Sequence, residues 1–482
     1  MSGRYDLVVV GGGTAALVAS LGVAGLGGRA AVVADGPLGG DCLWTGCVPS
    51  KTLLAAAGVV HAMRTADRHG LMPVDPEVDL ARVMAQVRAA QAVIEPHDSP
   101  ERLRAEGVEV IEARGRFAGP GVAVAGDREL RFRAALIATG SRPVVPPIPG
   151  LAAADPLTSE TVWELDELPA RLVVIGGGPV GCELGQAFAR LGSRVTIVEV
   201  APTLLAGAGP GVGELLAERL RGEGVDVATA THVTSVRGHE PVTVELTGSD
   251  VATSAVTADR ILVATGRRPN TADLGLDLVG VETGDDGRVL VDDRLRTSGD
   301  RIFAAGDVTA LMPFTHVAAH HARLVVTNAM FRTRRTVDHD AIPWAVFTDP
   351  EVARVGLDAT AARQRWGDDA IVQRFDHAGL DRAITAGDPA GWSELVADPK
   401  RRLVGATVVG AAAGESIAEL AAWMTAGAKV DRISTTVHAY PTFAEGPSRA
   451  ADDVLRGVYL SPTVRRLTTP LLAALRHLDR PR

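Results

Sequence analysis

Short apolar runs that end in glycine turns recur along the first two thirds of this chain of 482 residues. Residues 6–35 contain an apolar run (LVVV), a glycine turn (GGGTAA), an Ala-rich stretch and a second apolar run (AAVVA). Residues 171–199 repeat this order, with LVVI before the glycines and VTIVE at the end. Continuous apolar runs around a helix are typical of buried parallel strands. The pattern therefore predicts two βαβ units and an α/β fold.

Both glycine turns carry the spacing G-x-G-x-x-G/A. The motif positions are Gly11, Gly13 and Ala16 in the first turn, and Gly176, Gly178 and Gly181 in the second. Small residues let a pyrophosphate approach the backbone N–H groups at the start of the following helix. A single motif of this kind also occurs in ordinary tight turns, but two in the correct context favour two dinucleotide sites.

Three further strand-like segments follow the glycine turns, and the pattern changes after about residue 342. Residues 135–143 and 261–270 are each an apolar strand that ends in Ala-Thr-Gly and then reaches Arg-Pro, and residues 301–309 form a strand that ends on Gly306 and Asp307. From about residue 342, strand-like runs alternate with amphipathic helices and no glycine fingerprint recurs. This part is predicted to be a separate α+β domain.

Charge and composition exclude several classes of protein. The net charge of −9 argues against nucleic acid as a partner. The chain starts without a basic and apolar leader, and no run of about 18 apolar residues is evident, so we expect a cytoplasmic protein without a membrane span. The last residues, 457–482, place Arg and Leu at helical spacing; we expect a surface or interface arm, with membrane attachment as the alternative.

Two of the three cysteines, Cys42 and Cys47, lie in the segment GGDCLWTGCVPSK beside Lys51, one of only three lysines. The pair is structural, metal-binding or redox-active. In a regular helix five residues rise about 7.5 Å, beyond the Cα separation of about 7 Å that a disulfide allows, so a bridge needs an irregular turn, which Gly46 permits. A metal site needs further ligands, and no second cysteine pair exists. The redox interpretation is favoured, and no resident metal is predicted.

These features together resemble the pyridine nucleotide–disulfide oxidoreductases, the flavoenzyme family of dihydrolipoamide dehydrogenase, glutathione reductase and mercuric reductase. The segments GGDCLWTGCVPSK, FTHVAAH, IPWAVFTDPEVARVG and HAYPTFAEG are most similar to the mercuric-reductase-like branch. The resemblance implies two Rossmann-like domains for FAD and NAD(P)H, a C-terminal α+β dimerisation domain, and a homodimer whose active site is shared across the interface. The implied division is FAD domain 1–150 and 271–340, NAD(P)H domain 151–270, dimerisation domain 341–460 and C-terminal arm 461–482.

The resemblance also implies roles for individual residues. Cys47 would lie nearest the flavin and form a thiolate–flavin charge-transfer pair, and Cys42 would be the thiol that attacks the substrate. Lys51 would lie beside flavin N5 and pair with Glu183, which stabilises the reduced, anionic flavin. Asp307 would hold the ribityl chain. The remaining cofactor-binding positions of the matching motifs are Gly40, Thr139, Gly140, Gly266, Arg267 and Gly306.

The residues that end the second strand of each βαβ unit predict nucleotide choice. Glu199 can accept a hydrogen bond from a ribose 2′-OH and would repel a 2′-phosphate, which predicts NADH over NADPH. Mercuric reductases usually use NADPH, so NADPH stays the alternative. In the first unit Ala34 occupies the position where the family has an acidic residue. Neighbouring Asp35 either takes over the ribose contact or is simply solvated.

The segment HAYPTFAE departs from the disulfide reductases of the family. They carry a catalytic His before Pro-Thr, polarised by a later Glu, whereas this chain has Tyr440 there and keeps Glu445. A phenol with a pKa near 10 transfers thiol protons poorly at neutral pH, unlike an imidazole near 6.5. His438 is the other candidate base. Tyrosine also occurs here in mercuric reductases, beside bound Hg(II).

The sequence therefore predicts an enzyme that passes hydride from NADH through FAD to the Cys42–Cys47 disulfide, and then to a small acceptor. A thiophilic metal ion, a quinone or a disulfide with a good leaving thiol fits best. The competing hypotheses are quinone reduction by the flavin alone, dihydrolipoyl dehydrogenase activity, and a non-catalytic flavin redox sensor. Cys182 is interpreted as a packing residue, and the i,i+4 pair His316 and His320 as the start of a helix facing the flavin rather than a zinc site.

Overall fold

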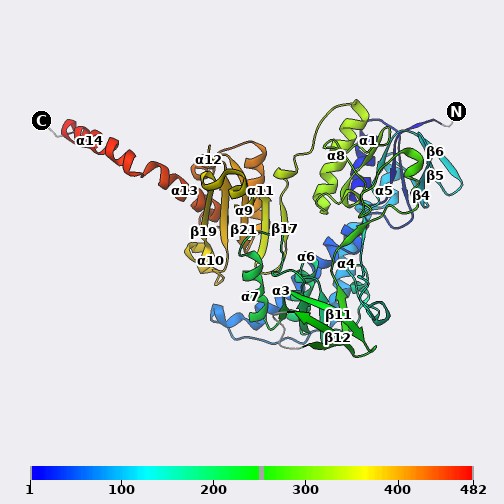
Figure 1. Ribbon diagram of the computed structural model, residues 1–482, viewed down its shortest axis with the longest axis horizontal. Helices are drawn as coiled ribbons and strands as arrows, with labels where there is room; N and C mark the ends of the chain where they lie inside the picture. Colours follow the sequence, from blue (N-terminus) through cyan, green and yellow to red (C-terminus); the bar gives the residue numbers. More distant parts are fainter. Residues whose placement is uncertain (1–2, 249–253, 480–482) are drawn as a thin grey trace. The chain divides into compact units, whose positions relative to one another are not determined.

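The computed structural model of the protein describes residues 3–248 and 254–479, and the chain separates into two compact units. Unit 1 contains the chain up to Leu204 and from Leu220 to Asp338, and unit 2 contains Leu205–Arg219 and the chain from His339 onward. Figure 1 shows the elements of both units in sequence colours.

The first sheet of unit 1 is the parallel sheet around the N-terminal apolar run. Strand β1 (Tyr5–Val10) pairs in parallel with β2 (Ala30–Ala34) and with β6 (Arg128–Ile137). Helix α1 (Thr14–Gly25) connects β1 to β2 and packs on both, which keeps the apolar side chains of these strands buried. The strand order is β3-β2-β1-β6-β5-β4. The outer strands are β3 (Glu109–Glu112), β4 (Gly115–Gly119) and β5 (Val122–Ala125).

A later strand of the chain returns to this first sheet. Strand β16 (Ile302–Ala304) pairs in parallel with β6, although about 165 residues separate them in sequence. Helix α8 (Thr315–Phe331) follows β16 and packs against α1. Segments from both ends of unit 1 therefore build one layered domain.

The second glycine fingerprint lies in a separate parallel sheet of unit 1. Strand β8 (Arg171–Ile175) pairs with β9 (Arg194–Val198) and β14 (Arg260–Val263), and α6 (Pro179–Leu191) connects β8 to β9. The division between the two units falls within α7 (Val212–Gly222). The other strands are β10 (Asp226–Ala228) at the sheet edge, the antiparallel set β11 (Thr231–Arg237), β12 (Val242–Gly248) and β13 (Ala255–Ala258), and the antiparallel pair β7 (Ser141–Pro143) and β15 (Arg267–Pro269).

The cysteine segment forms two helices, α2 (Gly40–Trp44) and α3 (Cys47–Arg64). Helix α3 packs against α4 (Leu80–Asp98) and α6, and α5 (Pro100–Ala105) follows α4. By length and composition alone the segment 40–64 is apolar enough to cross a membrane, because an 18-residue stretch of it has a mean hydropathy of 1.2. This result does not overturn the expectation that the chain has no membrane span. The finding is weak evidence of a span, because core helices of soluble proteins pass the same test.

Unit 2 is an antiparallel sheet covered by helices. The strand order is β17-β18-β21-β20-β19, and α11 and α13 pack on its two halves and share one apolar core with it. The strands are β17 (Trp344–Val346), β18 (Glu351–Gly356), β19 (Ile371–Asp376), β20 (Trp392–Ala397) and β21 (Leu403–Gly410). The helices are α9 (Ala359–Trp366), α10 (Asp381–Thr385), α11 (Ala413–Thr425), α12 (Val430–Thr435), α13 (Glu445–Tyr459) and α14 (Pro462–Leu478).

This architecture confirms the predicted fold class, with two βαβ-based sheets and a C-terminal α+β unit. The boundaries proposed between the FAD and NAD(P)H segments stay predictions; β7 and β15 lie close to them and pair with each other. The predicted arm is helical, and its last residues, 480–482, lie outside the described part of the chain.

Candidate active site

The break between α2 and α3 brings the two thiols together. Gly46 separates the helices, and its N–H donates to the carbonyl oxygen of Asp41. A Cβ at Gly46 would lie 2.8 Å from that oxygen, so only glycine allows this turn. The thiol of Cys42 consequently lies within hydrogen-bonding reach of Cys47, the first residue of α3.

Two distant side chains hold this irregular turn in place. The amide nitrogen of Gln91 donates to the carbonyl oxygens of Leu43 (3.1 Å) and Trp44 (2.9 Å), which α2 itself leaves without helical partners. The indole N–H of Trp163 donates to the carbonyl of Thr45 at 3.0 Å. The sequence carries no local signal for either residue, because each contact joins positions more than 45 residues apart.

The two thiols have different pKa values because their surroundings differ. The pKa of Cys47 is lowered to about 6, chiefly by the hydrogen bond from Cys42, and Thr315 Oγ1 at 3.2 Å and the charge of Lys51 act in the same direction against burial. The pKa of Cys42 is raised by the same hydrogen bond and by burial. At neutral pH Cys47 is therefore a thiolate and Cys42 a thiol. Thr315 begins α8 in the segment THVAAH and was not predicted as a site residue.

The reduced protein is expected to become more stable as the pH rises from about 6 to about 8.5. The folded-state pKa of Cys47 lies below that of a cysteine in an unfolded chain, about 8.5, so the unfolded chain binds more protons in this window. The contribution is complete above about 8.5 and is lost as the pH falls through about 6. Above the window, the raised pKa of Cys42 reverses the trend. Thermal unfolding of the dithiol form at a series of pH values measures the effect.

The Cys47→Ser variant serves as the test of this pH dependence. Serine keeps the size of the side chain but does not ionise, so the slope between about pH 6 and 8.5 should disappear. The Cys182→Ser variant should keep the slope, because the Cys182 thiol is fully buried and donates to the carbonyl of Gly177. An unchanged slope in Cys47→Ser would show that Cys47 is not the thiolate.

Lys51 and Glu183 meet although 132 residues separate them. Lys51 lies one turn along α3 from Cys47, and Glu183 lies on α6, which packs against α3. The ammonium nitrogen is 2.7 Å from Glu183 Oε2, and the carboxylate side chain is 8% exposed while the lysine is 37% exposed. The pair therefore fixes a cation beside the cysteines and anchors α3 to the second sheet.

Replacing Lys51 with methionine should lower the free energy of unfolding by about 2 kcal/mol. Removing one partner of a buried ion pair costs about 3–5 kcal/mol, and the partial exposure of Lys51 reduces this. Chemical denaturation measures the change. Lys400→Met is the matched control, because Lys400 is exposed and should change stability by less than about 0.5 kcal/mol. Equal effects of the two substitutions would rule out a structural role for the Lys51–Glu183 pair.

The first glycine turn has the shape that a dinucleotide pyrophosphate requires. Gly11 has a φ of +123°, and a Cβ there would lie 2.1 Å from the carbonyl oxygen of Ala138. Gly40 approaches Gly13 so closely that a Cβ would lie 2.7 Å from the Gly13 Cα atom. Helix α1 begins with Ala16 in its first turn and without a side-chain cap or an acidic residue there, so its N–H groups face the turn. These residues fit the FAD diphosphate.

The second glycine turn is built in the same way. Gly176 has a φ of +114°, and a Cβ at Gly181 would lie 1.9 Å from the carbonyl oxygen of Gly176. Gly178 caps α6 with no side-chain bond. The Glu199 carboxylate lies at the end of β9 and accepts hydrogen bonds from the N–H groups of Gly177 (2.5 Å) and Ala201 (2.7 Å). It therefore stands beside the turn, where a nucleotide ribose would lie.

The segments after the two Ala-Thr-Gly turns converge on Arg267. Its guanidinium donates to the hydroxyl (2.7 Å) and the carbonyl (2.8 Å) of Ser141 and contacts the Asp41 carboxylate next to Cys42. Ser141 also donates to Asp307 at 2.9 Å. Two of the predicted flavin-site residues, Arg267 and Asp307, thus share one network with the cysteine segment.

The remaining predicted cofactor positions lie around this network. Thr139 donates to the carbonyl of Asn270, joining the two Ala-Thr-Gly segments. Gly140, Gly266 and Gly306 have φ angles of +67°, +134° and +75°, which explains glycine at these turns. Asp35 is exposed after β2, beside the buried Ala34, in line with either interpretation made from the sequence.

The C-terminal candidates form a separate cluster in unit 2. The Tyr440 hydroxyl donates to Asp381 Oδ2 at 2.6 Å, and this bond and the charge of Asp381 raise the tyrosine pKa. His438 uses both ring nitrogens: Nδ1 lies 3.0 Å from the Thr436 carbonyl and Nε2 lies 3.0 Å from Glu419. Both ring nitrogens of His438 therefore already have partners within unit 2.

Glu445 contacts neither of the other two candidates in unit 2. It is the first residue of α13, accepts a bond from the Thr442 N–H at 3.4 Å and lies 3.4 Å from Arg449. The carboxylate that the family uses to polarise a histidine is thus present, and Tyr440 has its own acceptor, Asp381. Asp381 lies 59 residues before Tyr440 and was not predicted.

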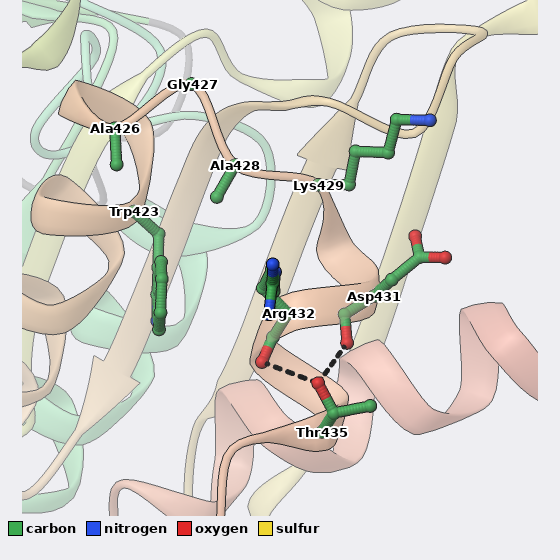
Figure 2. Close-up of a pocket in the computed structure, with 8 residues that line it drawn as sticks. All are labelled: Trp423, Ala426, Gly427, Ala428, Lys429, Asp431, Arg432 and Thr435. Carbon is green, nitrogen blue, oxygen red and sulfur yellow. Dashed lines mark hydrogen bonds between the residues drawn. The ribbon is translucent and has the colours of Figure 1, made fainter.

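Figure 2 shows an open hollow in unit 2. The turn from α11 to α12 lines it, and the Thr435 hydroxyl donates to the carbonyl oxygens of Asp431 and Arg432. The Asp431 carboxylate accepts two hydrogen bonds from the Arg401 guanidinium. The Trp423 indole N–H donates to Glu419, and we assign the hollow no chemistry.

Comparison with known proteins places this site in a family. Residues 5–322 match the pyridine nucleotide-disulphide oxidoreductases, and residues 342–451 match the dimerisation domain of the same proteins. A mercuric reductase of Streptomyces lividans is 38% identical over 455 residues, which cover 93% of this chain and 95% of the relative. A dihydrolipoyl dehydrogenase of Halobacterium salinarum is 34% identical over 463 residues, 93% and 96% of the two chains.

Solved structures of similar proteins superpose on this chain over most of its length. LpdA of Mycobacterium tuberculosis superposes with a TM-score of 0.85 at 28% identity, covering 93% of this chain and 99% of the other. The Cu(II) complex of the HOCl-induced flavoprotein disulfide reductase RclA of Escherichia coli gives 0.82 at 28% identity, covering 94% and 100%.

The fold and the site define a flavin-dependent oxidoreductase, and the chain belongs to the pyridine nucleotide-disulphide oxidoreductase family. Members use FAD and NAD(P)H, so the predicted family and cofactors are confirmed. Its relatives include both mercuric reductases and dihydrolipoyl dehydrogenases.

Proposed function

We propose that the protein is an NADH-dependent flavoenzyme that reduces a thiophilic metal ion of the Hg(II) type at the Cys42–Cys47 pair. The observation that carries this proposal is Tyr440, which stands where disulfide reductases of the family have a basic histidine and whose proton is held by Asp381. FAD, when bound, accepts a hydride from the nicotinamide and supplies an electron pair to the sulfur site.

The proton balance favours a metal ion over an alkyl disulfide. Reduction of a divalent ion follows NADH + M²⁺ → NAD⁺ + H⁺ + M⁰, so the product needs no proton from the protein. Reduction of a disulfide follows NADH + H⁺ + RSSR → NAD⁺ + 2 RSH, and the leaving thiolates must be protonated. Tyr440, with its raised pKa, and His438, with both nitrogens engaged, are poorly suited to that transfer.

The chemistry of the sulfur pair also supports a soft metal ion as acceptor. Cys47 provides a thiolate at neutral pH, and a soft cation can displace the Cys42 proton to gain a second thiolate ligand. Lys51 keeps a positive charge next to the pair. We infer that the dimerisation domain forms a homodimer in which Tyr440 of one subunit approaches the cysteines of the other.

Dihydrolipoyl dehydrogenase activity is the second candidate, because relatives of 33–35% identity carry that name. It requires the proton transfer for which Tyr440 is poorly suited. Quinone reduction at the flavin and a non-catalytic redox sensor are the third and fourth candidates. A panel of acceptors separates all four: the purified holoenzyme, reduced anaerobically with NADH, is offered Hg(II), lipoamide, small disulfides and quinones.

We expect Hg(II) to oxidise the reduced enzyme rapidly. Lipoamide should be turned over at least about a hundredfold more slowly than Hg(II). Lipoamide turnover at the Hg(II) rate would overturn the proposal in favour of dihydrolipoyl dehydrogenase. Oxidation by quinones alone would place the chemistry at the flavin. If no acceptor oxidises the reduced enzyme, the non-catalytic redox sensor is the hypothesis that remains.

The enzyme is expected to prefer NADH to NADPH by at least about tenfold in kcat/KM, a difference of about 1.4 kcal/mol. The Glu199 carboxylate beside the second glycine turn would repel a 2′-phosphate. Steady-state kinetics with both nucleotides measures the ratio. Glu199→Gln removes the charge at constant size and should lower the KM for NADPH. A wild-type preference for NADPH would contradict this assignment of Glu199.

A further inference from the structure

The C-terminal helix α14 (Pro462–Leu478) lies beyond residue 451, where the match to the family's dimerisation domain ends. It has its own start signal: the Ser461 side chain accepts a hydrogen bond from the Val464 N–H, and Pro462 occupies the first turn. Figure 1 shows α14 continuing from α13 and projecting away from the sheet of unit 2. The helix is therefore a separate, capped element.

One face of α14 is a continuous apolar line. Its members recur at spacings of three and four residues, so at about 100° per residue they fall within an arc of about 80°. They are Val464, Leu467, Leu471, Leu475 and Leu478. No residue of α14 is buried, and Leu467, Leu471 and Leu478 are 71%, 59% and 79% exposed. The described part of the chain therefore does not cover this face.

The other face of α14 carries only positive charge. Arg465, Arg466 and Arg476 lie there, and residues 460–478 contain no Asp or Glu in a chain whose net charge is −9. The hydroxyls of Thr468 and Thr469 donate to carbonyls one turn earlier, which lowers the cost of moving this helix out of water. A line of leucines opposite arginines is the pattern of helices that lie in a lipid interface.

We propose that α14 binds the surface of an anionic lipid bilayer, with its leucines in the acyl boundary and its arginines at the lipid phosphates. Charge complementarity decides between this partner and a second α14 helix. A second α14 helix packed on the leucine line would cover it but would bring no carboxylate to the arginines of the opposite face, because residues 460–478 contain none. Anionic headgroups satisfy the arginines, and the acyl region covers the leucines. The exposed leucine line and the absence of acidic residues thus favour membrane attachment over the interface arm.

Sedimentation of the full-length holoenzyme with lipid vesicles tests the proposal. Vesicles of phosphatidylglycerol and phosphatidylcholine should bind the protein at least about tenfold more tightly than vesicles of phosphatidylcholine alone, and added salt should weaken binding. Leu471→Asp places a charge at the centre of the apolar line and should reduce binding at least about tenfold. Leu472→Asp is the matched control: the neighbouring residue is 49% exposed, lies about 100° from Leu471 outside the line, and its substitution should change binding less than about threefold.

Two further measurements use the same proteins. NADH oxidation should be unchanged in both variants, and the mass of the particle by light scattering should equal that of the wild type. If Leu471→Asp instead dissociates an oligomer, α14 covers a second copy and the proposal fails. It also fails if the wild type does not bind anionic vesicles, or if both aspartate variants bind them equally well.

Discussion

Replacing Cys42 with serine is expected to abolish reduction of Hg(II), by about a thousandfold or more, and to leave quinone reduction intact. Cys42 is the protonated partner that holds the Cys47 thiolate, so its loss removes one of two sulfur ligands and raises the pKa of the other. A soft metal ion then has one sulfur ligand in place of two. Anaerobic stopped-flow oxidation of the NADH-reduced variant by Hg(II) measures the loss.

Quinone reduction by the same sample is the internal control for Cys42→Ser. It requires bound FAD and bound NADH but no sulfur, so a normal rate shows that the variant is folded and loaded. Cys47→Ser should lose the metal activity as well and, in addition, the long-wavelength absorbance that a thiolate beside the flavin produces. Retention of Hg(II) reduction by Cys42→Ser would show that electrons reach the acceptor without the pair.

Replacing Tyr440 with histidine should raise lipoamide turnover by about a hundredfold or more. An imidazole with a pKa near 6.5 can protonate a leaving thiolate at neutral pH, and general acid–base catalysis is worth about 10²–10⁴-fold. Glu445, five residues later, supplies the carboxylate that polarises this histidine in the family. Steady-state kinetics with lipoamide between pH 6 and 9 measures the gain, which should follow the titration of one group.

Two control variants distinguish the effect of the added base from the effect of a changed side-chain shape. Tyr440→Phe removes the hydroxyl and its bond to Asp381 without adding a base, so lipoamide turnover should stay low. Tyr459→His introduces the same imidazole at another exposed tyrosine, the last residue of α13, and should have no effect. An equal gain with phenylalanine would show that access, rather than proton transfer, limits disulfide reduction. Fast lipoamide turnover by the wild type would contradict the role assigned to Tyr440.

Local sequence was sufficient for the fold class and for the turn that brings the two thiols together. Continuous apolar runs specify buried parallel strands, and the glycines that follow them are required because a Cβ at Gly11 would collide with backbone. Gly46 between the cysteines likewise permits the turn that joins the thiols. These features depend on neighbours within a few residues, so spacing alone predicts them.

The tertiary structure decided the electrostatics of the site. Thr315 reaches Cys47 across 268 residues, and Asp381 reaches Tyr440 across 59. Whether such groups meet depends on how helices and strands pack, and no periodicity in the sequence encodes it. The same holds for α14: its pattern predicted a helix, but only the structure shows that its leucine face stays uncovered by the described part of the chain. The sequence by itself therefore determined the fold class and the groups that we propose carry the chemistry, while packing determined which of them hold a proton, since hydrogen bonds and burial set each pKa.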